Sequence, residues 1–170
     1  MASRGETIRK WLLYGLSALL LAIVQLALLQ RIRLFGVIPF VWPLLALIPA
    51  SYEGPLGGGI FALACGVVCD LLLPSPIPCL YTLVFPLAAI LTAFLAVPLR
   101  SGISCSLLSG ILGFSLIDLV RFLTLRVYPE VFLSVALREL LVTLPLCVPV
   151  TLLYAALYRR THENDSRRPV

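Results

Sequence analysis

Six apolar runs follow one another along this 170-residue chain, separated by charged or Pro/Gly-rich breaks, and their lengths suit passage through a lipid bilayer. They cover residues 11–29, 34–50, 56–73, 77–99, 103–125 and 137–158. Because lipid offers the backbone no hydrogen bonds, each run must be helical. The sequence therefore predicts an all-α, polytopic membrane protein with six transmembrane helices in one compact bundle.

The composition excludes several other classes of protein. Apolar residues make up 61% of the chain and charged residues 12%, whereas a soluble domain is about half apolar and about a quarter charged. The net charge of +5 comes from basic residues at the chain ends and between the apolar runs. There they indicate topology and contacts with lipid headgroups, and we expect no nucleic-acid partner.

The basic residues favour a cytoplasmic position for both termini, which an even number of spans places on one side. Eight basic residues would then lie inside: Arg4, Arg9, Lys10, Arg100, Arg159, Arg160, Arg167 and Arg168. Five would lie outside: Arg31, Arg33, Arg121, Arg126 and Arg138. The predicted organisation is a cytoplasmic N-terminus at 1–10, the transmembrane domain at 11–158 and a cytoplasmic polar tail at 159–170.

Polar side chains within the apolar runs form a candidate buried layer. With a rise of about 1.5 Å per residue, Gln25 and Asp70 lie about 8 Å, and Asp118 about 5 Å, beyond the midpoints of their spans toward the outer face. A carboxylate at such depth costs about 2.5–3.5 kcal/mol unless it is paired or protonated. We therefore expect Arg121, which is spaced i,i+3 from Asp118, or Arg138 to pair with an Asp.

Small residues mark a candidate packing or partner-binding face. Gly58, Ala62 and Gly66 recur every four residues before Asp70, a pattern typical of closely packed membrane helices, and Gly110 and Gly113 form a looser version in the fifth run. Two interpretations remain open. The polar and small residues either hold the bundle together or form a surface for a partner or ligand.

The sequence offers little for catalysis or cofactor binding. The five cysteines include no CxxC pair and the single histidine, His162, lies in the tail, so we expect no metal. No serine lies in a nucleophile elbow, no phosphate loop is present, and the sequences GVVCDLL and SLIDLVR do not match intramembrane aspartyl proteases. We therefore expect neither a cofactor nor an enzyme.

Several short motifs together resemble the bacterial rod shape-determining membrane protein family MreD. They are a first helix ending ALLQ, the Pro-led IPFVWPLLAL, CGVVCDLL, SLIDLV, YPEVF and a basic pair after the last helix. The chain departs from the family pattern at Phe40 and Pro78. The residues that match it are Gly66, Asp70, Asp118, Pro129 and Glu130, and the last two suit the first turn of an outer helix.

The resemblance implies a non-enzymatic scaffold of the cell-elongation machinery, located in the bacterial inner membrane. Its implied partners are an MreC-like single-span protein, the elongation glycosyltransferase and transpeptidase, directly or indirectly, and indirectly an MreB-type filament. A second interpretation is the substrate-binding membrane subunit of an energy-coupling-factor vitamin transporter, whose size and helix number are similar. In that case the polar layer would be a ligand pocket.

Overall fold

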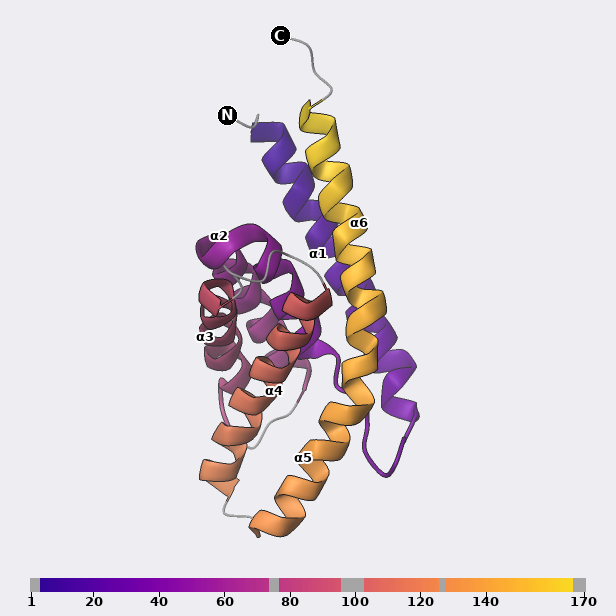
Figure 1. Ribbon diagram of the computed structural model, residues 1–170, viewed down its shortest axis with the longest axis vertical. Helices are drawn as coiled ribbons and strands as arrows, with labels where there is room; N and C mark the ends of the chain where they lie inside the picture. The colour runs from indigo at the N-terminus through magenta and orange to yellow at the C-terminus, as the bar shows by residue number, and fades with distance from the viewer. Residues whose placement is uncertain (1–3, 74–76, 96–102, 126–127, 167–170) are drawn as a thin grey trace.

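The computed structural model describes residues 4–73, 77–95, 103–125 and 128–166, and all the regular elements in these ranges are helices (Figure 1). The α-helices are α1 (Arg4–Ala27), α2 (Trp42–Leu72), α3 (Leu80–Leu95), α4 (Ile103–Leu125), α5 (Pro129–Thr143) and α6 (Cys147–Ser166). Two 3-10 turns, η1 (Leu29–Arg31) and η3 (Leu144–Leu146), follow α1 and α5. The predicted all-α class is confirmed.

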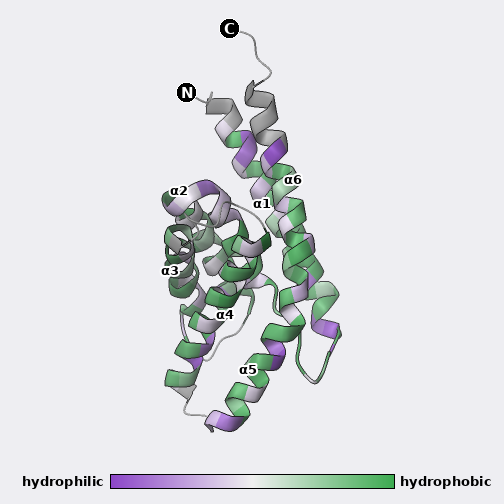
Figure 2. Cartoon of the chain, in the orientation of Figure 1, coloured by the Kyte–Doolittle hydropathy of each residue, from purple (hydrophilic) through white to green (hydrophobic). Residues whose placement is uncertain are grey.

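Within the described residues, four helical stretches are long and apolar enough to cross a membrane. They are Thr7–Arg31, Trp42–Leu72, Ile103–Thr124 and Pro129–Arg159, with a shorter apolar helix at Leu80–Phe94. Figure 2 shows that hydrophobic residues predominate along the length of these helices. Many of these are exposed Leu and Ile side chains, including Leu12, Leu16 and Leu20 of α1. Lipid accommodates such a surface, whereas water does not.

The predicted second span, 34–50, is helical over only part of its length. Helix α2 starts only at Trp42, and the preceding segment contains an isolated bridge between Leu34 and Val37 and a left-handed Gly36 with φ 80°. The prolines explain the late start. Proline has no backbone N–H to donate, which is tolerated in the first turn of a helix, where Pro43 lies, but would remove a hydrogen bond at Pro39 if the helix began at residue 34. The helix from 42 to 53 is about 18 Å long, which is shorter than the roughly 30 Å hydrocarbon core.

Helix α2 reverses direction at Gly54, whose φ of 79° and ψ of 175° are not helical. A Cβ atom added at Gly58 would lie 2.5 Å from the Cα of Ala50. Eight residues of one straight helix would span about 12 Å, so this approach requires two antiparallel arms. We call residues 42–53 the first arm and residues 55–72 the second arm.

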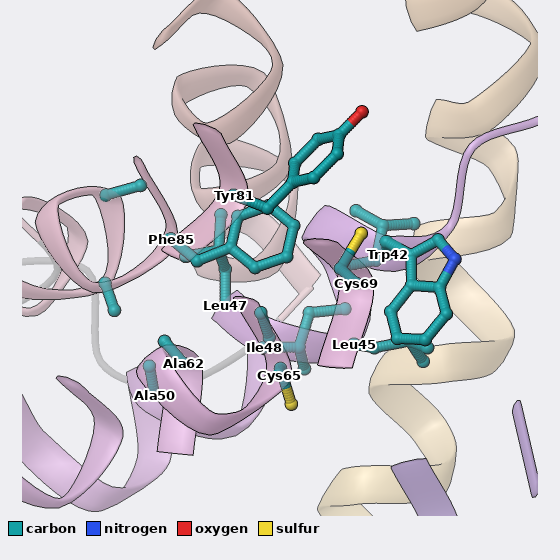
Figure 3. Packing of buried hydrophobic residues seen from close by; sticks show 14 of the residues in the cluster. Trp42, Leu45, Leu47, Ile48, Ala50, Ala62, Cys65, Cys69, Tyr81 and Phe85 are labelled. Carbon is teal, nitrogen blue, oxygen red and sulfur yellow. The ribbon is translucent and has the colours of Figure 1, made fainter. Parts of the chain in front are cut away.

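The first arm forms the centre of the molecule. Its residues 42–50 are all buried. Figure 3 shows their side chains gathered with Ala62 and Cys65 of the second arm and with Tyr81 and Phe85 of α3. Helices α1 and α6 lie side by side at one edge, and the start of α1 and the end of α6 lie at the same end of the molecule (Figure 1).

The other predicted boundaries differ mainly at the helix ends. The predicted fourth span, 77–99, corresponds to α3, and residues 96–99 lie outside the described residues. The fifth matches α4, at 103–125. The predicted sixth span, 137–158, is part of a longer path through α5, η3 and α6, in which Pro145 interrupts the α-helical hydrogen bonding. Helix also extends into both predicted polar ends, from Arg4 and as far as Ser166.

Candidate functional site

Arg121 joins three helices in a polar cluster. Its Nη2 donates a hydrogen bond of 2.7 Å to the hydroxyl oxygen of Tyr81 on α3. Its Nη1 lies 3.8 Å from Asp118 Oδ1 on its own helix, α4, and 3.7 Å from Glu139 Oε2 on α5. We call Tyr81, Asp118, Arg121 and Glu139 the Arg121 cluster. The expected pairing of Asp118 with Arg121 is present, whereas Glu139 was not expected to take part.

The ring of Phe40 covers the Arg121 cluster. The guanidinium carbon of Arg121 lies 5.8 Å from the centre of this ring, a cation–π distance, and the rings of Phe40 and Tyr81 are 5.6 Å apart. The backbone N–H of Phe40 donates to Thr143 Oγ1 at 3.2 Å. The segment before the first arm is thereby connected to α3, α4 and α5.

Gln25 of α1 holds the backbone on both sides of Phe40. Its Nε2 donates to the carbonyl oxygen of Pro39 at 2.8 Å, and its Oε1 accepts from the N–H of Val41 at 3.0 Å. The side chain is only 2% exposed. An amide suits this position because it provides one donor and one acceptor. Gln25 is thus linked to Asp118 and Arg121 of the predicted polar layer only indirectly, through the backbone on either side of Phe40.

Asp70 caps the first turn of α3 from the neighbouring helix α2. Its carboxylate accepts hydrogen bonds from Tyr81 N at 3.2 Å, from Thr82 N at 2.8 Å and from Thr82 Oγ1 at 2.6 Å. The first N–H groups of a helix have no partner within the helix and carry a partial positive charge. The N-terminus of α3 therefore stabilises the carboxylate of Asp70, whereas we expected an arginine to do so. Arg138, the alternative candidate partner, is exposed on α5.

The predicted small-residue face is covered by the chain itself. A Cβ atom added at Gly66 would lie 2.5 Å from the carbonyl oxygen of Tyr81, and one at Gly110 would lie 3.0 Å from Leu44 Cδ2. Gly58 meets Ala50, Gly113 meets Leu47, and Ala62 is fully buried. These small residues allow close packing within the bundle, so a partner would have to displace other helices to reach them.

A groove of about 410 Å³ opens between α4 and α5, beside the Arg121 cluster. Phe114, Asp118 and Phe122 of α4 and Phe132, Leu133 and Leu137 of α5 contribute to its walls. Pro129, the first residue of α5, also lines it, and Glu130 lies in the same first turn. The groove is mainly apolar, and Asp118 brings a carboxylate to its wall.

A second polar contact, at the Gly54 turn, was missed in the sequence. Lys10 of α1 forms a salt bridge with Glu53 Oε2, and the side chain of Glu53 is 8% exposed. The other carboxylate oxygen, Glu53 Oε1, and the hydroxyl oxygens of Tyr14 and Tyr154 are buried without a hydrogen-bond partner among the described residues. The available signal in the sequence was a glutamate directly before Gly54 and Pro55, in the break between two apolar runs.

Taken together, these polar groups form contacts that can join helices and recognise a charged or hydrogen-bonding ligand. Comparison of the chain with family models, with curated proteins and with solved structures finds no match.

Proposed function

We propose that this chain is a non-enzymatic scaffold of the bacterial cell-elongation machinery, similar to MreD, located in the inner membrane. It binds an MreC-like single-span protein and thereby supports peptidoglycan synthesis and the control of cell shape. The motifs CGVVCDLL, SLIDLV and YPEVF support this assignment, as do the long apolar helices.

The groove between α4 and α5 is the observation that carries the proposal. The small residues of α2 are occupied by contacts within the chain, but the α4–α5 groove is open and lined mainly by apolar side chains. Pockets of this kind between membrane helices accept a further helix through van der Waals packing and a few polar contacts. Binding and orientation of a partner need no reacting group.

The proposal includes six passages of the chain through the inner membrane, with both termini in the cytoplasm. The reversal at Gly54 supports this topology because it separates two arms that run in opposite directions. The common position of the start of α1 and the end of α6 supports an even number of passages (Figure 1). The first arm is too short to cross alone and makes its passage together with the segment before it.

A vitamin-transporter subunit fits the groove less well. Recognition of a polar vitamin requires several hydrogen-bonding groups that converge on one cavity. The groove offers Asp118 and Ser115 among mainly apolar side chains. We therefore propose protein binding in preference to vitamin uptake.

The decisive experiment is co-expression of the full-length chain with the MreC-like protein of the same genome, followed by purification in mild detergent. A stable complex, together with loss of rod shape when the chain is depleted from cells, is the expected result. Thermal unfolding with a panel of vitamins is the control, because a ligand at 100 times its Kd adds about 2.7 kcal/mol to the stability. If no complex forms and a vitamin stabilises the protein, the proposal of a scaffold function is wrong.

A further inference from the structure

Asp118 is an incompletely satisfied acceptor in the wall of the α4–α5 groove. Its closest cation is Nη1 of Arg121 at 3.8 Å, and its side chain is 17% exposed. Among the described residues, no hydrogen bond reaches the carboxylates of Asp118 or Glu139: the guanidinium of Arg121 donates to Tyr81 and lies 3.8 and 3.7 Å from the two carboxylates. Two carboxylates thus share one guanidinium, and the groove has room for a further donor.

The depth of Asp118 determines which donors can reach it. Seven residues separate Asp118 from the end of α4 at Leu125, which corresponds to about 10 Å along the helix. Lipid amines lie in the headgroup region, outside the hydrocarbon core, and acyl chains provide no donor. A side chain carried into this depth by another transmembrane helix can provide one.

We propose that the α4–α5 groove receives one transmembrane helix of a partner protein, and that this helix carries a basic side chain that pairs with Asp118. This inference rests on the proposed function and specifies how the partner is recognised. The apolar walls, including Phe122, Phe132 and Leu133, contact the apolar face of the incoming helix. The basic side chain sets its depth and orientation, since opposite charges attract strongly where water is scarce.

Synthetic transmembrane helices provide the test. The probes are Leu/Ala peptides of about 22 residues, one of which has a single Lys placed about 10 Å from the end of its apolar stretch. One control peptide lacks the Lys and another has Glu at the same place. The full-length protein, labelled at the exposed Cys79, is reconstituted in phosphatidylethanolamine–phosphatidylglycerol vesicles. Energy transfer between the label and a dye on the peptide measures binding.

We expect the Lys peptide to bind about three- to eighteen-fold more tightly than the peptide without Lys, as interhelical polar contacts in membranes are worth about 0.6–1.7 kcal/mol. Asp118→Asn should remove this preference. Ala136→Phe, which fills the groove, should weaken binding of both peptides, whereas Leu87→Phe on the exposed face of α3 should not.

Equal binding of all three peptides would overturn the inference, as would a groove occupied by co-purified lipid or by a second copy of the chain. Thermal unfolding of each variant shows whether it is folded, and Ala136→Phe provides an independent test if Asp118→Asn is not. If Asp118→Asn and Ala136→Phe both retain the MreC-like partner, the groove is not the binding site, but the proposed function stays in place. If the Lys peptide binds but no complex with the MreC-like partner forms, the proposed function is rejected and the groove remains a binding site for a basic transmembrane helix.

Discussion

Replacement of Gly66 by Ala tests how the second arm of α2 packs against α3. The added Cβ atom would lie 2.5 Å from the carbonyl oxygen of Tyr81 and 2.9 Å from the Cα of Thr82. Both are backbone atoms, which cannot move aside as a flexible side chain can. An ordinary contact begins near 3.4 Å, so the two helices must separate by about 0.9 Å at this point.

This separation affects the cap that Asp70 provides one turn further along α2. The hydrogen bond from Thr82 N, now 2.8 Å, would lengthen to about 3.7 Å, which is beyond the usual limit. Overpacking of this kind costs about 1–3 kcal/mol, and the gain from replacing a helical glycine by alanine is about 0.5–1 kcal/mol. We expect a net loss of about 1–2 kcal/mol, which corresponds to a decrease in Tm of about 2–8 °C.

The assay is thermal unfolding of the protein in detergent, followed with a thiol-reactive fluorophore after the exposed Cys79 has been blocked, because Cys65 and Cys69 are buried and react only after unfolding. Gly59→Ala is the matched control on the same helix. Its Cβ atom would lie 3.5 Å from Ile90 Cγ1, an ordinary contact, so its stability should be unchanged or increased. Equal Tm values for the Gly66 and Gly59 variants would refute the packing argument.

Three further substitutions test the polar contacts by the same unfolding assay. Asp70→Ala removes the cap of α3 and should cost about 0.5–2 kcal/mol, and an unchanged Tm would show that water replaces the carboxylate. Gln25→Leu leaves the N–H of Val41 and the carbonyl oxygen of Pro39 without a partner and should cost about 1–3 kcal/mol. Cleavage by protease in residues 32–41 should accelerate, and unchanged proteolysis would argue against a role of Gln25 in holding this segment. Arg121→Leu should destabilise more than the double substitution with Glu139→Leu, since the single change leaves both Asp118 and Glu139 unpaired and the double change leaves only Asp118. The reverse order would argue against a structural role of the Arg121 cluster.

The helical class follows directly from the sequence because backbone hydrogen bonds in lipid leave few alternatives for long apolar runs. The contact between Asp118 and Arg121 was also predictable, since three residues of helix place both side chains on one face. In both cases the constraint is local, and a single sequence contains all the information needed.

Contacts between distant segments could not be predicted in this way. The prolines limit where the first arm can begin, but the position of the segment before it depends on Gln25, which lies 14 and 16 positions away from the residues that it contacts. Hydrophobicity alone does not distinguish this short buried helix from a full span. Asp70 likewise has an available arginine in the sequence, but the N-terminus of α3 compensates a carboxylate equally well, and only the fold selects between them.

Four of the five residues on which the proposed resemblance to MreD rests fall into two groups with different surroundings in the structure. Gly66 and Asp70 are one helical turn apart, and they act together: the missing side chain at 66 lets α2 approach α3 closely enough for the carboxylate at 70 to cap it. Asp118 and Pro129 instead line the open groove. Stability and partner binding should therefore separate, with substitutions at the first pair lowering Tm and substitutions at Asp118 weakening the partner complex in a protein that remains folded.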